Sequence, residues 1–129
     1  MTENEISKEV VDATIHVHRT LGPGLLESVY EMVLEHELTK RGLQVERQVK
    51  SPVEYDGLKF DEGFRADMIV DGKVVLELKS VEALTSSHRK QIQTYLRLTG
   101  LKLGLLLNFG AALMKDGIVR AVNGLEEQA

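Results

Sequence analysis

The chain has 129 residues, of which 43% are hydrophobic and 28% charged, and it contains no cysteine. This composition predicts one globular domain with its own core, and the lack of cysteine excludes disulfides, thiolate metal sites and cysteine nucleophiles. The net charge of −4 argues against a protein that coats nucleic acid by charge alone, and the 5% of aromatic residues does not favour a base-stacking platform.

The start of the chain lacks the features of an export signal. Residues 2–5 are polar or acidic, whereas a signal peptide begins with a basic region and continues into an apolar one. No apolar stretch approaches the roughly 20 residues that a membrane span needs. We therefore expect a cytoplasmic protein without membrane contact, in which residues 1–129 form a single domain.

Two helices are predicted in the first third of the chain. The first covers about residues 3–20, where apolar residues return on one helical stripe every three or four positions. Gly22-Pro23-Gly24 ends this helix. The second covers about residues 25–41, and Gly42 stands where a left-handed residue commonly follows a helix.

The middle of the chain changes to the two-residue period of strands. Strands are predicted at 45–49, 53–55, 58–60, 64–70 and 73–79. The breaks between them are marked by Ser51-Pro52, Asp56-Gly57 and Asp71-Gly72. The last two of these are good hairpin turns, so neighbouring strands are expected to pair in antiparallel fashion.

The last third supplies another helix and two strands. The helix begins at Ser86 or Ser87, either of which would serve as its N-cap, and runs to Leu98. After it come a nearly continuous apolar strand at 101–108, a turn at 115–117 and a strand at 118–122. The tail from Asn123 is expected to fray. The whole order predicts an α/β fold, a mixed sheet of about four main strands with helices on both faces and a small hairpin extension.

The strongest chemical pattern lies on the two central strands. Glu77 and Lys79 are two residues apart on one strand, so they share a face, and Asp67 lies on the preceding strand. A three-residue loop between these strands would place Asp67 across from Glu77. A two-residue loop would pair Asp67 with Leu76 and send the carboxylates to opposite faces.

Opposed carboxylates repel each other, and a cation is the usual reason to bring them together. Two carboxylates with waters suit Mg²⁺, and a nearby lysine would hold a nucleophilic water or stabilise charge on the phosphate. The alternative is that Glu77 and Lys79 form an exposed pair on a solvated face, worth a few tenths of a kcal/mol.

The second helix offers Glu27 as a further acidic residue. On a helical wheel Glu27 falls inside the apolar arc, so it faces the core or a cavity and would need a partner such as the metal. Glu37 falls in the same arc, which leaves an amphipathic helix with tolerated edge charges as the alternative. Tyr30 is interpreted as a packing residue.

The third helix carries Gln91 and Tyr95 four residues apart, with His88 one turn earlier. These residues would bind a phosphate or orient the lysine of the strand; the alternative is a helix edge with the tyrosine ring in the core. Four basic residues either form a local positive patch or are simply solvated: Arg65, Arg89, Lys90 and Arg97.

The run from Leu21 to Glu31, Leu-Gly-Pro-Gly-Leu-Leu-Glu-Ser-Val-Tyr-Glu, resembles the signature of the GxxExxY protein family, a branch of the PD-(D/E)xK nuclease superfamily. The resemblance extends from about Val10 to Val122. In it, the superfamily's metal-binding aspartate, Glu-x-Lys pair and helical acidic residue correspond to Asp67, Glu77, Lys79 and Glu27. Gln91 and Tyr95 match the Gln-x-x-x-Tyr element of RecB-like exonucleases, and Ala66 replaces the superfamily's proline.

This resemblance implies a restriction-endonuclease-like α/β/α core and cleavage of phosphodiester bonds in nucleic acid with Mg²⁺, for which Mn²⁺ is a substitute. DNA is favoured over RNA as the substrate, and both stay open. It also implies the residue roles: Asp67 and Glu77 hold the metal with help from Glu27, Lys79 positions or activates the water, and Gln91 and Tyr95 orient the substrate or the lysine. The alternative is a non-catalytic nucleic-acid-binding or protein-interaction module on the same fold. A homodimer is considered beside both, because small nucleases often bind two-fold substrates.

Overall fold

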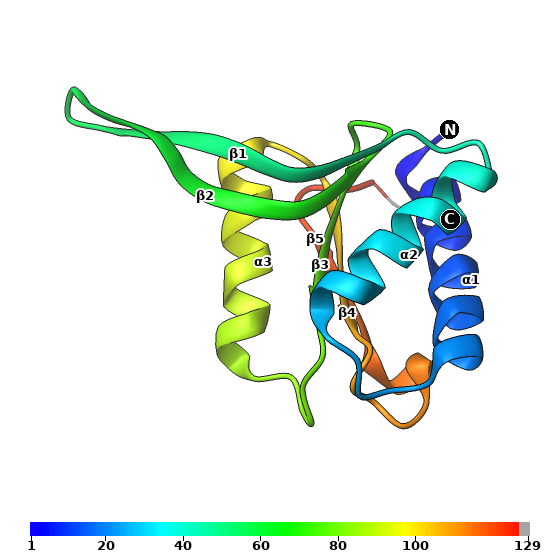
Figure 1. Cartoon of the computed structure of the whole chain (residues 1–129). Coiled ribbons are helices and arrows are strands. Elements are labelled where there is room, and N and C mark those ends of the chain that lie inside the picture. The colour runs from blue at the N-terminus through cyan, green and yellow to red at the C-terminus, as the bar shows by residue number, and fades with distance from the viewer. Residues whose placement is uncertain (127–129) are drawn as a thin grey trace.

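A five-stranded sheet runs through the middle of the molecule in the order β1-β2-β3-β4-β5 (Figure 1). The computed structural model describes residues 1–126. The strands are β1 (Val45–Tyr55), β2 (Leu58–Val70), β3 (Val74–Lys79), β4 (Leu103–Asn108) and β5 (Ile118–Val122). The helices are α1 (Glu3–Leu21), α2 (Glu27–Lys40), α3 (Ser86–Thr99) and a short 3₁₀ helix, η1 (Met114–Gly117). All neighbouring strands pair in antiparallel fashion except β3 and β4, which are parallel and joined through α3.

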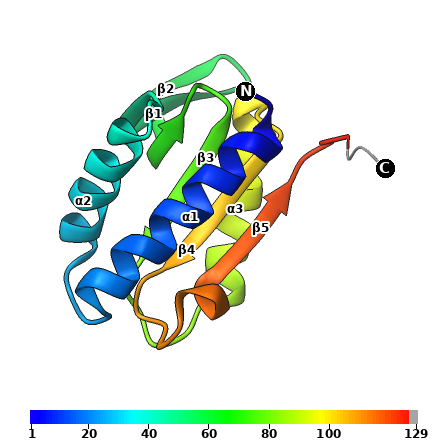
Figure 2. The ribbon, with the colours of Figure 1, turned by 90° about the vertical axis from the view of Figure 1, so that its right-hand side faces the viewer.

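Helices cover both faces of this sheet, α1 and α2 on one side and α3 on the other (Figure 2). On β3, Leu76 and Leu78 pack in the core formed with α1 and α2, while Val75 packs with Ile92 and Leu96 of α3. A parallel strand pair with a helical crossover needs this cover on both faces. The predicted α/β fold with a mixed sheet and helices on both faces is confirmed.

Helix α3 begins one residue earlier than the sequence suggests. Its N-cap is Thr85 and not Ser86 or Ser87. The Thr85 hydroxyl accepts a hydrogen bond from the His88 backbone N–H (3.3 Å), and the Thr85 N–H donates to Nδ1 of His88 (3.1 Å). The two bonds form a capping box, which satisfies two N–H groups at the start of the helix.

Strands β1 and β2 extend beyond the sheet as a long hairpin, here called the arm (residues 50–64), which projects past α3 (Figure 1). The expectation of separate short strands in this region is wrong. β1 continues through Pro52 because this residue lies on an edge strand, at the register shift, where it has no Cα partner in β2. The pairing shifts between Ser51 and Val53, and a Cβ on Gly63 would lie 2.1 Å from Cγ2 of Val53. Only glycine therefore fits at this irregularity.

The beginning of the C-terminal tail is held in place, contrary to the expectation that it frays from Asn123. The Asn123 N–H donates to the Lys102 carbonyl (2.9 Å), and its side chain donates to the carbonyls of Leu96 and Leu101 (3.2 Å each). Leu125 packs against the core. The rest of the expected fraying, at residues 127–129, lies outside the described residues. Within residues 1–126, no helix is both long and apolar enough to cross a bilayer.

Candidate active site

The candidate site lies where β2 and β3 separate. Their ladder ends at the pair Met68 and Leu76, in the register of a three-residue loop, so Asp67 comes next to Glu77. At this point each carboxylate accepts a hydrogen bond from the opposite strand. Oε1 of Glu77 accepts from the Asp67 N–H (3.3 Å), and Oδ2 of Asp67 accepts from the Leu78 N–H (2.8 Å). The two acids thus converge at the fork between the strands.

Glu77 is the most perturbed ionisable group of this site. Its side chain is only 4% exposed. Burial raises the pKa of Glu77 to about 9, the negative charge of Asp67 and a hydrogen bond with its carboxylate add to the rise, and Lys79 opposes it. At neutral pH the Glu77 carboxyl therefore carries a proton, which a bound cation would displace.

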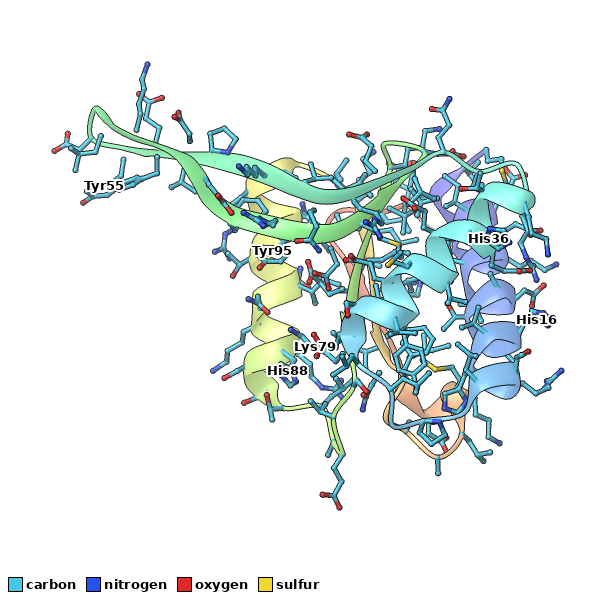
Figure 3. The ribbon with its side chains drawn as sticks, in the orientation of Figure 1. His16, His36, Tyr55, Lys79, His88 and Tyr95 are labelled. Atoms are coloured by element: carbon cyan, nitrogen blue, oxygen red, sulfur yellow. The ribbon has the colours of Figure 1, made fainter. Side chains whose placement is uncertain are left out.

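Lys79 lies at the end of β3, half-buried, on the face shared with Glu77 (Figure 3). Its carbonyl accepts a hydrogen bond from the Phe109 N–H (2.8 Å), which fixes the backbone of this strand end to the residue after β4. Asn108 strengthens the same junction, because its side chain bonds both the N–H and the carbonyl of Val81. The lysine is thus carried on rigid backbone.

Glu27 lies in the first turn of α2 and contacts the residue that follows β3. Its Oε1 accepts a hydrogen bond from the Ser80 N–H (3.3 Å), and the Ser80 hydroxyl donates to the Leu25 carbonyl (2.7 Å). Glu27 is exposed and does not face the core. It faces a cavity of about 210 Å³, as the helical wheel allowed, and the residues lining that cavity are Glu27, Ser28, Glu31, Gln48, Asp67 and Leu78.

Tyr30 is a packing residue, as the sequence suggested, and it also fixes the loop before α2. Its hydroxyl donates to the Gly22 carbonyl (2.5 Å) and accepts from the Leu25 N–H (3.1 Å). Its buried ring stacks on Phe109, with centroids 4.4 Å apart. This clamp sets where α2 starts and therefore where Glu27 points.

Glu31 is an acidic residue of the site that the sequence analysis missed. It lies one helical turn after Glu27 and lines the same cavity as Asp67. Nε2 of Gln48 donates to Oε1 of Glu31 (2.7 Å). Burial raises the pKa of Glu31, the Gln48 bond opposes that rise, and the charge of Asp67 adds to it. The four-residue spacing from Glu27 was the available signal. By contrast, Glu37 forms ion pairs at the surface.

Helix α3 contributes Tyr95, whose mostly buried ring stacks on Phe64 with centroids 4.5 Å apart. Burial raises the pKa of the Tyr95 hydroxyl, and the charges of Glu77 and Asp67 raise it further, which places this hydroxyl within their field. Gln91 is exposed one turn earlier. Nδ1 of His88 accepts the hydrogen bond from the Thr85 N–H at the helix cap.

The donor set fits a hard divalent cation. Within residues 1–126, no group of three or more carboxylate or imidazole side chains comes together as a metal site, so Asp67 and Glu77 form a pair with Glu27 and Glu31 set apart. Mg²⁺ is commonly held by one or two carboxylates, with waters and substrate phosphates completing its shell. Buried Glu77 and partly buried Asp67 supply such a pair of carboxylates.

Comparisons with known proteins agree with the geometry. The family model described as PD-(D/E)XK nuclease superfamily matches residues 4–121. The crystal structure of SSO0001 superposes with a TM-score of 0.54 and 22% identity over 93% of this chain, which shows a similar fold. This chain spans 59% of that structure's length. No curated protein matches the sequence.

Proposed function

Because the chain belongs to the PD-(D/E)XK nuclease superfamily, we propose that it hydrolyses phosphodiester bonds of nucleic acid with Mg²⁺, or Mn²⁺ as a substitute. The convergence of Asp67 and Glu77 at the fork between β2 and β3 supports this proposal most strongly. DNA is the first substrate to test. The lack of cysteine fits a reducing compartment, so the proposal places the activity in the cytoplasm.

Each residue of the site has a definite task in this proposal. Asp67 and Glu77 supply the carboxylate ligands, and Glu27 assists them from α2. A bound divalent cation would lower the pKa of a coordinated water and neutralise charge on the phosphate. The Lys79 ammonium donates hydrogen bonds to the attacking water or to phosphate oxygens, where negative charge develops.

Two residues of α3 are assigned to the substrate. The Tyr95 hydroxyl is held by the stack on Phe64 and donates to a phosphate oxygen or to the water that Lys79 orients. The exposed amide of Gln91 contacts the substrate one turn away. Both tasks are positioning ones, so their loss should lower the rate less than loss of a carboxylate does.

Cleavage assays with matched variants test this proposal. Single- and double-stranded DNA would be incubated with the wild type in Mg²⁺, Mn²⁺ or EDTA, and with Glu77→Gln and Lys79→Met. Glu37→Gln is the control, since it removes an acid of α2 that pairs only at the surface. We expect metal-dependent cleavage that falls about 100-fold or more in both site variants and is unchanged in the control.

Two results would contradict the proposal. Full activity of Glu77→Gln would exclude the carboxylate pair from the reaction. Binding of DNA by the wild type with no cleavage in either metal would favour the non-catalytic binding module. Sedimentation of the same samples shows whether the active species is a homodimer.

A further inference from the structure

The aromatic residues fall into two groups that the sequence does not reveal. Of the three tyrosines and three phenylalanines, Tyr30 and Phe109 stack on each other in the core. The other four lie on the arm and on α3, and they are Tyr55, Phe60, Phe64 and Tyr95. All the aromatic residues outside this core stack are therefore on the arm and α3.

The tip of the arm presents one apolar face to solvent. Tyr55 is paired with Leu58, and Val53 with Phe60, so these four side chains lie on the same face of the hairpin. Tyr55, Leu58 and Phe60 are 73%, 59% and 54% exposed. Figure 3 shows Tyr55 on the side of the arm where α3 and Tyr95 lie. The opposite face of the tip carries the cross-strand pair Glu54 and Lys59.

At its inner end the arm joins the site through an aromatic contact. Phe64 of β2 stacks on Tyr95 of α3, and Asp67 follows three residues later on the same strand. Strand β2 therefore connects the exposed apolar tip of the arm to the fork, where the two carboxylates lie.

The neighbouring helix is cationic. α3 contains Arg89, Lys90 and Arg97, all exposed, and no acidic residue. Among residues 1–126, the ion pairs within 4.0 Å do not include any of these three. The arm differs: Lys50 pairs with Glu62, as does Arg65 just beyond the arm, and Lys59 lies across from Glu54. The positive charge therefore comes from α3. The arm reaches α3 through the stack of Phe64 on Tyr95, so its aromatic residues and the positive charge of α3 are together complementary to a polyanion with exposed bases.

We infer that the arm tip and α3 together bind single-stranded nucleic acid and lead it to the carboxylate pair. Unpaired bases stack on exposed aromatic rings with little dependence on sequence, and basic side chains follow the phosphates. In a duplex the faces of the bases are already covered, so a single strand is favoured. The inference deepens the proposed nuclease function by naming its substrate class, and it rests on that function only for the cleavage that follows binding.

Binding measured without cleavage tests the inference separately from the nuclease proposal. Fluorescence anisotropy of the full chain in EDTA would compare an oligothymidine of about 20 nucleotides with a duplex of the same length. The test variants are Tyr55→Ala with Phe60→Ala, and Arg89→Gln with Lys90→Gln. Met32→Ala is the control, since Met32 is an equally exposed apolar residue on α2.

We expect the single strand to bind at least tenfold more tightly than the duplex. The aromatic double variant should lose about tenfold or more of this affinity, whereas Met32→Ala should not change it. The α3 variant should weaken binding and reduce its dependence on salt concentration. Circular dichroism and thermal unfolding would show that the variants fold, as expected for substitutions of exposed side chains.

Several results would overturn the inference. These are absence of single-strand binding by the wild type, a preference for duplex, or unchanged binding by the aromatic double variant. If that variant changes the sedimentation coefficient and not the affinity for DNA, the arm is a contact between copies of this chain. Loss of binding in the variant together with a wild type that never cleaves would support the inference while rejecting the nuclease proposal.

Discussion

The two faces of strand β3 carry different kinds of side chain. On one face, Leu76 and Leu78 are fully packed beneath α1 and α2, close to the buried stack of Tyr30 on Phe109. On the other face, Glu77 and Lys79 take the same alternating positions. There a carboxylic acid is buried beside a second one, and its pKa is raised to about 9.

Under the proposed function, this difference separates the residues that stabilise the fold from those that carry the chemistry. The α1/α2 face of β3 has apolar packing, and the Tyr30 hydroxyl beside it has both a donor and an acceptor, which stabilises the fold. The α3 face places like charges in a poorly solvated position, which costs stability until a cation or a proton compensates for them. A site that breaks the rules obeyed by the rest of the molecule is expected to be functional.

The largest effect is expected on the packed face. Tyr30→Ala removes a fully buried ring, its stack on Phe109 and the clamp on the loop before α2. We expect it to lower the free energy of unfolding by about 3–5 kcal/mol, as for other large-to-small core substitutions. Urea unfolding followed by circular dichroism measures this. A loss below about 1 kcal/mol would mean that the stack does not support the fold.

On the α3 face of β3, a substitution of Glu77 should raise the free energy of unfolding instead of lowering it. In the unfolded chain the Glu77 carboxyl titrates near 4.5, and in the folded protein near 9. Between these values the folded state holds the extra proton, so its stability falls as the pH rises. Glu77→Gln should therefore be more stable than the wild type at pH 8 in EDTA, by up to about 5 kcal/mol.

The same comparison at pH 6 and pH 8 isolates this group from others that titrate. The advantage of Glu77→Gln over the wild type should grow between the two pH values. An advantage that is absent, or equal at both, would show that burial does not shift the pKa of Glu77.

The same tyrosine-to-phenylalanine substitution, made once on each side of the sheet, sharpens the contrast. Tyr30→Phe leaves the Gly22 carbonyl and the Leu25 N–H without their partner, and it should cost about 1–3 kcal/mol of stability. Tyr95→Phe should cost less than about 1 kcal/mol and should lower the cleavage rate about tenfold. Unfolding and cleavage of both variants would be measured together. Equal stability losses, or unchanged cleavage by Tyr95→Phe, would contradict the assigned roles.

The smallest stability change is expected in the arm. Gly63→Ala pushes the Val53 side chain away from the shifted pairing. The arm lies outside the core, so the free energy of unfolding should change by less than about 1 kcal/mol. Hydrogen exchange of the arm amides should nevertheless become faster, because this hairpin has little else to support it. Exchange unchanged in the arm would show that the glycine is not needed there.

Sequence periodicity was enough to predict the layered fold, because apolar stripes and turns depend on neighbouring residues and can be read locally. It left two loop lengths open between β2 and β3, and only one of them places Asp67 beside Glu77. The structure has the three-residue loop, which brings the two carboxylates together. The GxxExxY signature remains a resemblance, while the superfamily is established by the match to residues 4–121.

What the sequence could not show depends on contacts between distant segments. Pro52 looked like a break because the edge position of β1 is set by the whole sheet. Glu31 joins the site through Gln48, whose backbone takes a positive φ of 53° that is unusual for this residue type. Likewise, the gathering of aromatic residues on the arm follows from strand pairing and not from composition.

The measurement that tests the central claim most directly is a calorimetric titration of Mg²⁺ into the wild type at pH 8, in two buffers with different ionisation enthalpies. Since Glu77 is protonated in the metal-free protein, we expect binding that releases about one proton per chain. Glu77→Gln should abolish both the binding and the release, and Glu37→Gln should leave both unchanged. Absence of binding by the wild type, or binding without proton release that persists in Glu77→Gln, would contradict a cation site at the Asp67–Glu77 pair.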